Sequence, residues 1–96
     1  MSAAGKVRQV GVDLQDSEDT HGLVDAIEAD NPGAAVVHMP GLIRVTMPGE
    51  LVIRRDSVTG QLGRDWQTHE FQLSIVSYFG TIAEWDDDKI VIKWEH

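Results

Sequence analysis

Residues 35–54, AVVHMPGLIRVTMPGELVIR, contain three short apolar runs separated by two copies of the tripeptide Met-Pro-Gly. The runs at 35–38, 42–46 and 51–54 are rich in the β-branched and aliphatic residues that favour strands. In each tripeptide, proline at the second position and glycine at the third suit a type II turn, because glycine accepts a positive φ. This stretch predicts an antiparallel meander of three strands.

The segment before the meander predicts a strand followed by a helix. Residues 7–14 alternate so that Val10, Val12 and Leu14 share one face, as in a half-buried strand. Asp16 or Ser17 can then cap a helix over 18–29, which carries apolar residues at helical spacing. The helix is expected to end at Asn31, because a residue before proline disfavours the helical region.

The segment after the meander predicts a shorter helix. Asp56 or Ser57 can cap it, Val58 and Leu62 lie at i,i+4, and Gly63 can close it. Residues 68–70 are then expected to form a single turn.

The last quarter of the chain predicts three strands. Alternating residues at 71–79 indicate the first, and Gly80 can mark a bulge or bend after it. Residues 81–85 and 89–94 are expected to pair across the turn 86–88, with Trp94 continuing the core face of Ile90 and Ile92.

The predicted order of elements is β-α-β-β-β-α-β-β-β. This order is typical of a small α+β domain, largely antiparallel sheet with two main helices on one face. The two halves of the chain are loose copies of one strand–helix–strands unit, so two similar sub-domains are an alternative to a single domain over residues 1–96.

The composition excludes several classes of function. The chain has 96 residues, no run near the ~20 apolar residues of a membrane span, and no apolar signal segment in residues 1–6, where we expect a flexible tail. It has no cysteine, which excludes disulfides, thiolate metal sites and iron–sulfur clusters. The net charge of −8 disfavours nucleic-acid binding, which requires a basic surface. We therefore expect a cytoplasmic protein that binds neither nucleic acid nor membrane.

The sequence contains no constellation typical of catalysis or of cofactor binding. Glu18 and His21 have the Glu-x-x-His spacing of diiron ligands, but such a site needs a second copy and further glutamates. His38 and His69 have no evident nucleophile to activate. The expectation is a binding module with no catalytic, metal or cofactor-binding residues, although a small enzyme using His38 or His69 stays an alternative.

Four segments together resemble the effector proteins of bacterial multicomponent diiron monooxygenases. They are AAVVHMPGLIRV at 34–45, LVIRR at 51–55, QLGRDW at 61–66 and FQLSIVSYFGT at 71–81. The likeness extends from about Val10 to Trp94, and it is strongest to the phenol hydroxylase branch. The toluene and methane monooxygenase effectors are more distant.

The resemblance implies a cofactor-free regulatory component rather than an enzyme. Such a component would bind the diiron hydroxylase of a phenol or other aromatic monooxygenase and would promote coupled, NADH-dependent hydroxylation. Electrons would come from a separate reductase that carries flavin and an iron–sulfur cluster. The runner-up function is a generic acidic interaction module or inhibitor that binds a basic partner.

The resemblance also indicates partner-binding residues. In the methane-oxidising relatives, the stretch equivalent to 74–80 contacts the hydroxylase, although three of its residues are smaller there than Ser77, Tyr78 and Phe79. Transferred to this sequence, the predicted contacts are Ser74, Val76, Ser77, Tyr78, Phe79 and Gly80. The turn formed by Met39, Pro40 and Gly41 is a second candidate contact, but proline and glycine there also have a purely structural explanation.

Overall fold

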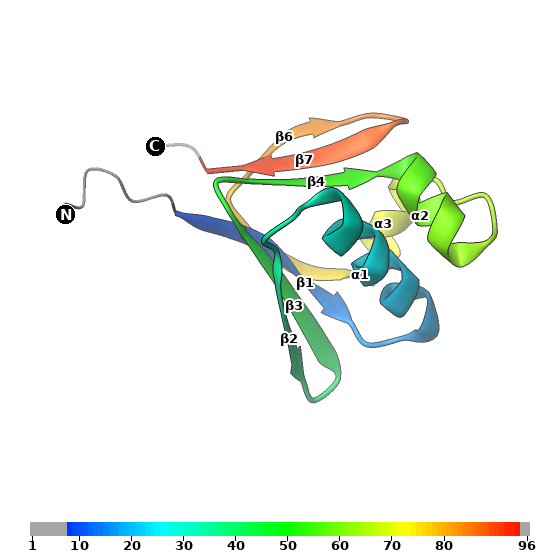
Figure 1. Ribbon diagram of the computed structural model, residues 1–96, viewed down its shortest axis with the longest axis horizontal. Helices are drawn as coiled ribbons and strands as arrows, with labels where there is room; N and C mark the ends of the chain where they lie inside the picture. The colour runs from blue at the N-terminus through cyan, green and yellow to red at the C-terminus, as the bar shows by residue number, and fades with distance from the viewer. Residues whose placement is uncertain (1–7, 95–96) are drawn as a thin grey trace.

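The computed structural model describes residues 8–94, and Figure 1 shows the arrangement of their helices and strands. The predicted tail at residues 1–6 and the terminal His96 lie outside this range. The strands are β1 (Gln9–Gln15), β2 (Ala35–Met39), β3 (Leu42–Pro48), β4 (Glu50–Arg54), β5 (Ile75–Phe79), β6 (Thr81–Trp85) and β7 (Lys89–Lys93). The helical segments are α1 (Glu18–Asp30), α2 (Arg55–Leu62), the 3-10 turn η2 (Thr68–Glu70) and α3 (Phe71–Ser74). The predicted α+β class and order of the main elements are confirmed.

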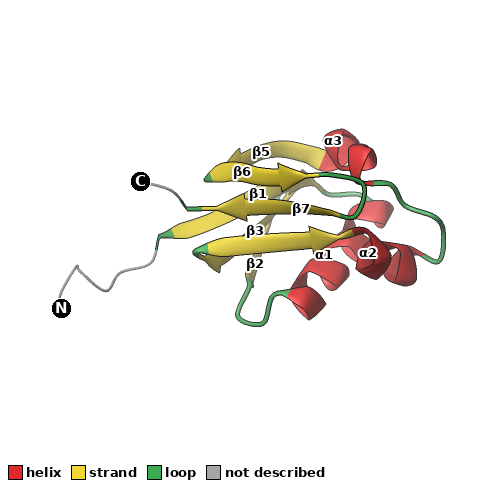
Figure 2. Cartoon of the chain, turned by 90° about the horizontal axis from the view of Figure 1, so that it is seen from above, coloured by secondary structure: helices red, strands yellow, loops and turns green. Residues whose placement is uncertain are grey.

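The strands form two antiparallel sheets. The first has the order β2-β3-β1-β5, and the second has the order β4-β7-β6. Seen from above, the helical segments gather toward one end of the strands (Figure 2). No helix among residues 8–94 is long and apolar enough to cross a membrane.

The predicted meander is wrong at its third strand. Strands β2 and β3 pair across the Met39-Pro40-Gly41 turn as expected, but β4 pairs with β7 in the other sheet. The chain changes sheet at Gly49, whose φ of +78° turns it away from β3. Gly49 is held there because its amide donates to the Arg8 carbonyl and its own carbonyl accepts from the Trp94 amide, both at 2.9 Å.

Both sheets contribute to one hydrophobic core. The alternation in β1 buries Val10, Val12 and Leu14 against the apolar face of α1, as predicted. Leu51 and Ile53 of β4 lie opposite Ile92 and Ile90 of β7 and belong to the same cluster. The two halves of the chain therefore share one core.

Trp94 does not join this core, which corrects the prediction for it. Strand β7 ends at Lys93, so the buried alternation of Ile90 and Ile92 does not reach Trp94. Its side chain is 37% exposed, and the Arg8 guanidinium lies 4.9 Å from the centre of the indole. Trp66, in contrast, is buried in the core.

The first helix begins and ends as the sequence predicts. The Ser17 hydroxyl accepts from the Thr20 amide at the N-terminus, and Asn31 is the C-terminal cap. The Asn31 amide nitrogen donates to the carbonyls of Ile27 and Val52, and its oxygen accepts from the Val52 amide at 2.9 Å. Because β4 is an edge strand, Asn31 both caps α1 and fastens the helix to the second sheet.

Two local predictions in the second half are wrong. Helix α2 starts at Arg55, and its cap residue is Arg54, which makes no side-chain cap bond, so neither Asp56 nor Ser57 caps the helix. The predicted end at Gly63 is confirmed, since Gly63 is the C-terminal cap with a φ of +71°. The predicted strand over 71–79 is a strand only from Ile75 onward, because Phe71–Ser74 is helical. The helical turn begins at Gln67, whose amide donates to the Glu70 carboxylate at 2.9 Å in a capping box.

Candidate functional site

Strand β5 lies at an edge of the first sheet and exposes apolar side chains. Leu73 of α3 is 77% exposed, and Val76 and Tyr78 of β5 are 56% and 47% exposed. These are three of the five large hydrophobic residues that are exposed among residues 8–94, and they fall within six consecutive positions. We refer to Leu73, Val76 and Tyr78 as the α3–β5 patch; contiguous exposed apolar residues of this kind mark interaction sites.

A pocket of about 370 Å³ adjoins the α3–β5 patch. Residues of α3, β5 and β6 line it, and we call it the β5 pocket: Gln72, Ile75, Val76, Ser77, Tyr78, Ile82 and Trp85. None of these side chains is charged. Trp85 is fixed by an edge-to-face contact with the buried Phe71, with ring centres 5.9 Å apart.

An ion pair between Asp13 of β1 and Arg44 of β3 ties β5 to its sheet through Ser77. Arg44 donates to Asp13 from Nε at 2.8 Å and from Nη2 at 3.1 Å, and Ser77 Oγ donates to the same carboxylate at 3.0 Å. The Arg44 guanidinium also lies 4.8 Å from the centre of the Phe79 ring. The Arg44 hydrogen bonds lower the pKa of Asp13, although burial opposes them.

The backbone of β5 is irregular at both ends of this network. The register with β1 shifts between Asp13 and Leu14, opposite Ser77 and Ile75. Gly80, which follows β5, has a φ of +113°, and a Cβ there would approach the Lys93 carbonyl and a Val10 methyl to 2.9 Å. The predicted bend at Gly80 is therefore present, and it carries the chain from the first sheet to the second.

The predicted contact residues fall into two separate regions. Those from Ser74 to Gly80 lie together on α3, β5 and the bend: Val76 and Tyr78 in the patch, and Ser77 and Phe79 at the ion pair. Met39, Pro40 and Gly41 lie at the turn between β2 and β3, and β2 is the edge strand farthest from β5. Gly41 has a φ of +72°, as the predicted turn requires.

Sequence reasoning missed part of this surface. Leu73 sat in an alternation that suggested burial, and nothing in the sequence placed Ile82 beside β5, since β5 and β6 belong to different sheets. The pattern also gives no environment for Trp85, whose side chain is half-buried and lines the β5 pocket.

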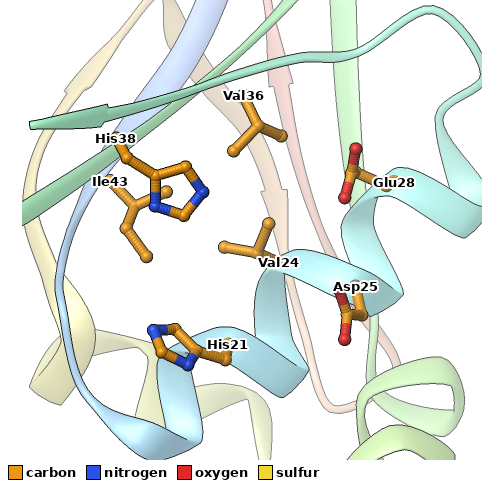
Figure 3. A pocket seen from close by; sticks show the side chains of 7 residues that line it. All are labelled: His21, Val24, Asp25, Glu28, Val36, His38 and Ile43. Atoms are coloured by element: carbon orange, nitrogen blue, oxygen red, sulfur yellow. The ribbon is translucent and has the colours of Figure 1, made fainter.

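A second groove, of about 290 Å³, lies between α1 and the strands β2 and β3. His21 and His38 stand on opposite sides of it, with Val24 and Ile43 between them and Asp25 and Glu28 along α1 (Figure 3). His21 Nε2 lies 2.7 Å from Asp16 Oδ1. The lining contains no hydroxyl or thiol that a histidine could activate.

The charged residues close to His69, the other candidate histidine, form structural contacts. Glu70, beside the exposed His69, accepts from the Gln67 amide and from Arg64 at 3.1 Å, and these bonds lower the pKa of Glu70. Arg64 also donates to Asp19 at 2.8 Å. Within residues 8–94, no three histidine, aspartate or glutamate side chains come together as metal ligands would.

Comparison with known proteins assigns the family. The model of the MmoB/DmpM family matches residues 8–93. The chain is 37% identical over 87 residues to the stimulatory component DmpM of phenol 2-monooxygenase from Pseudomonas sp. (strain CF600), covering 91% of this chain and 96% of that protein. The chain belongs to the MmoB/DmpM family.

Solved structures support the same assignment to the MmoB/DmpM family. A chain from a phenol hydroxylase–regulatory protein complex matches with a TM-score of 0.85 and 34% identity, over 92% of this chain and all of that chain. The soluble methane monooxygenase regulatory protein B shares the fold, with a TM-score of 0.71 and 19% identity, over 99% of this chain and 74% of that one.

The family confirms the resemblance predicted from the sequence. The chain is homologous to stimulatory and regulatory components of monooxygenases, not to their catalytic subunits. This kinship favours a regulatory component over both a small histidine-dependent enzyme and a generic acidic inhibitor.

Proposed function

We propose that this chain is the cofactor-free regulatory component of a phenol or other aromatic monooxygenase, and that it docks on the hydroxylase through the α3–β5 patch. The observation that supports docking there is the group of exposed apolar residues on α3 and the edge strand β5. The solved structures of similar proteins include a phenol hydroxylase–regulatory protein complex. The docked component would promote NADH-dependent hydroxylation that is coupled to product formation.

The patch can act in regulation only through a difference in affinity. A regulator changes its partner only by binding one conformation of it more tightly than another. Shifting a two-state equilibrium almost completely takes about 5.5 kcal/mol of differential affinity. Burying the exposed parts of Leu73, Val76 and Tyr78 would add to this difference to the extent that one conformation of the hydroxylase covers them and the other does not.

The remaining predicted contacts have distinct roles in this proposal. Ser74 and Gly80 delimit the docking segment, and Ser77 and Phe79 hold it through Asp13 and Arg44. The turn at Met39, Pro40 and Gly41 would be a second contact at the far edge of the sheet. Its exposed proline and glycine can approach a partner backbone closely.

The proposal extends to the wider enzyme system. The hydroxylase would carry the diiron centre, and a reductase with flavin and an iron–sulfur cluster would deliver electrons from NADH without binding this chain permanently. Residues 1–96 would act as one effector domain. A cytoplasmic location would give the system access to NADH.

The docking surface can be tested with one substitution and a matched control. Tyr78→Ala removes a patch side chain, and Trp94→Ala removes an exposed aromatic residue outside the patch. With purified phenol hydroxylase, Tyr78→Ala should raise the concentration that gives half-maximal stimulation by at least fivefold, and Trp94→Ala should leave it within twofold. Both variants should keep the wild-type circular dichroism spectrum. Unchanged stimulation by Tyr78→Ala would contradict docking through the patch.

A further inference from the structure

We propose that the β5 pocket receives one apolar side chain of the hydroxylase, which anchors the docked complex. This inference rests on the function proposed above, and it adds a specific recess and the chemical class of the group that enters it. The pocket shares Val76 and Tyr78 with the α3–β5 patch. A partner that covers the patch therefore also covers the mouth of the pocket.

The lining of the pocket selects an uncharged occupant. Although 25% of the residues in the chain are charged, none of them lines the pocket. Two hydroxyl groups belong to the lining, those of Ser77 and Tyr78. The Ser77 hydroxyl already donates a hydrogen bond to Asp13. The groove at α1 is different, because Asp25, Glu28 and two histidines surround it. Of the two recesses, the β5 pocket is the one suited to an apolar group.

The pocket has a rigid floor. Ile75, Ile82 and Trp85 line the pocket and also pack against the hydrophobic core. The contact between Trp85 and Phe71 fixes the indole, and the bend at Gly80 fixes β6 beside β5. A preformed recess costs little conformational entropy on binding, which is the condition under which buried anchors become hot spots.

The pocket is large enough to receive a side chain of the partner. Small-molecule sites enclose about 300–1,000 Å³, and the β5 pocket, at about 370 Å³, is near the lower limit and open to the surface. A leucine, methionine or phenylalanine side chain of the partner has room to enter it. Gln72 and Tyr78, which line the pocket and are exposed, could then hydrogen-bond to the partner backbone around the anchor.

Filling the pocket from within tests this proposal. Ile82→Phe enlarges a lining side chain, and Ala83→Phe adds the same side chain at the next residue, which is exposed and outside the lining. In a titration of phenol hydroxylase stimulation, Ile82→Phe should raise the half-saturating concentration at least tenfold. Ala83→Phe should stay within twofold of the wild type. Equal half-saturating concentrations for Ile82→Phe and the wild type would contradict the proposal that the pocket receives a side chain of the hydroxylase.

A labelling experiment keeps the test decisive if Ile82→Phe folds poorly. The chain has no cysteine, so a single cysteine can carry an environment-sensitive fluorophore without background. A label on Gln72→Cys at the pocket should shift its emission to shorter wavelength when the hydroxylase is added, whereas a label on the exposed Gln61→Cys of α2 should not. If sedimentation shows that the labelled protein binds the hydroxylase but the emission of the label at residue 72 does not shift, the proposal that the pocket is occupied in the complex is wrong.

The possible outcomes distinguish a failure of the pocket proposal from a failure of the proposed regulatory function. If the wild-type chain stimulates the hydroxylase but neither the filling variant nor the label responds, the pocket is wrong and regulation stands. If phenol alone shifts the label at residue 72 as fully as the hydroxylase does, the pocket binds a small aromatic molecule and the side-chain anchor is wrong. If the wild-type chain neither binds nor stimulates the hydroxylase, both proposals fall.

Discussion

Asp13 shows what a single residue can and cannot reveal in the sequence. The alternation in β1 places it on the face opposite the core, where a solvated carboxylate would be expected. Instead it is buried by Arg44, which is 31 positions away, and by Ser77, which is 64 positions away. Sequence periodicity gives the face of a residue but not its cross-strand neighbours, so neither partner could be predicted.

The lowered pKa of Asp13 predicts a pH dependence of stability. A carboxylate whose pKa is lower in the folded state stabilises the fold above its unfolded pKa and loses this contribution as the pH falls through the folded value. The free energy of unfolding should therefore decrease below about pH 4. Asp13→Asn should make this decrease shallower but not abolish it, because Glu70 and Asp86 also have lowered pKa values. Urea unfolding between pH 3 and 6 measures this, and identical slopes for Asp13→Asn and the wild type would contradict it.

Asn31 illustrates a residue whose position was predictable and whose full role was not. Its place before Pro32 predicted the end of α1, but its bonds to Val52 depend on the position of the second sheet. Asn31→Ala should lower the free energy of unfolding by about 2 kcal/mol, because it leaves backbone groups of the β4 edge unpaired.

The control for Asn31 is a change to aspartate. Asn31→Asp keeps an acceptor for the Val52 amide but cannot donate to the carbonyls of Ile27 and Val52. It should therefore not restore wild-type stability in urea unfolding at pH 7. A loss below 0.5 kcal/mol for Asn31→Ala would show that these bonds contribute little.

At the scale of elements, the clearest failure of the sequence pattern is the segment 71–74. Phe71, Leu73 and Ile75 alternate as if they shared a buried face, but α3 turns Phe71 into the core and Leu73 into solvent. The cause is the capping box between Gln67 and Glu70, which commits the chain to a helical turn before the alternation begins. The capping interaction thus makes residues 71–74 helical, although their alternating apolar pattern is that of a strand.

The two opposed environments can be distinguished by substitution. Leu73→Gln should change the free energy of unfolding by no more than about 0.5 kcal/mol, as is usual for surface sites. Phe71→Ala should cost about 3–5 kcal/mol, because it empties a fully buried site. Chemical unfolding of both variants checks this. A large loss for Leu73→Gln would mean that residue 73 is buried, as in the strand predicted from the sequence.

For the whole molecule, the sequence predicts the local pairings and misses the distant ones. The hairpins β2–β3 and β6–β7 follow from their turns, whereas the pairings of β1 with β5 and of β4 with β7 do not. The two Met-Pro-Gly tripeptides show the difference directly. The first makes a hairpin, and the second carries the chain to another sheet, because Gly49 is held between Arg8 and Trp94.

The same limit applies to the candidate site: residues close in sequence could be predicted together, and residues from another sheet could not. Val76 and Tyr78 came from resemblance to a family, and they lie together in the patch. Ile82 and Trp85 complete the pocket only because the bend at Gly80 places β6 beside β5. A site built by two sheets cannot be read from either strand alone.

The most direct test of the proposed function is the yield of catechol per NADH consumed by a purified phenol hydroxylase and its reductase, with this chain titrated in. We predict a saturable rise in that yield, with Tyr78→Ala requiring more protein for the same effect. No rise, with a hydroxylase that responds to its own regulatory protein, would contradict the assignment of this chain as a regulator of that enzyme.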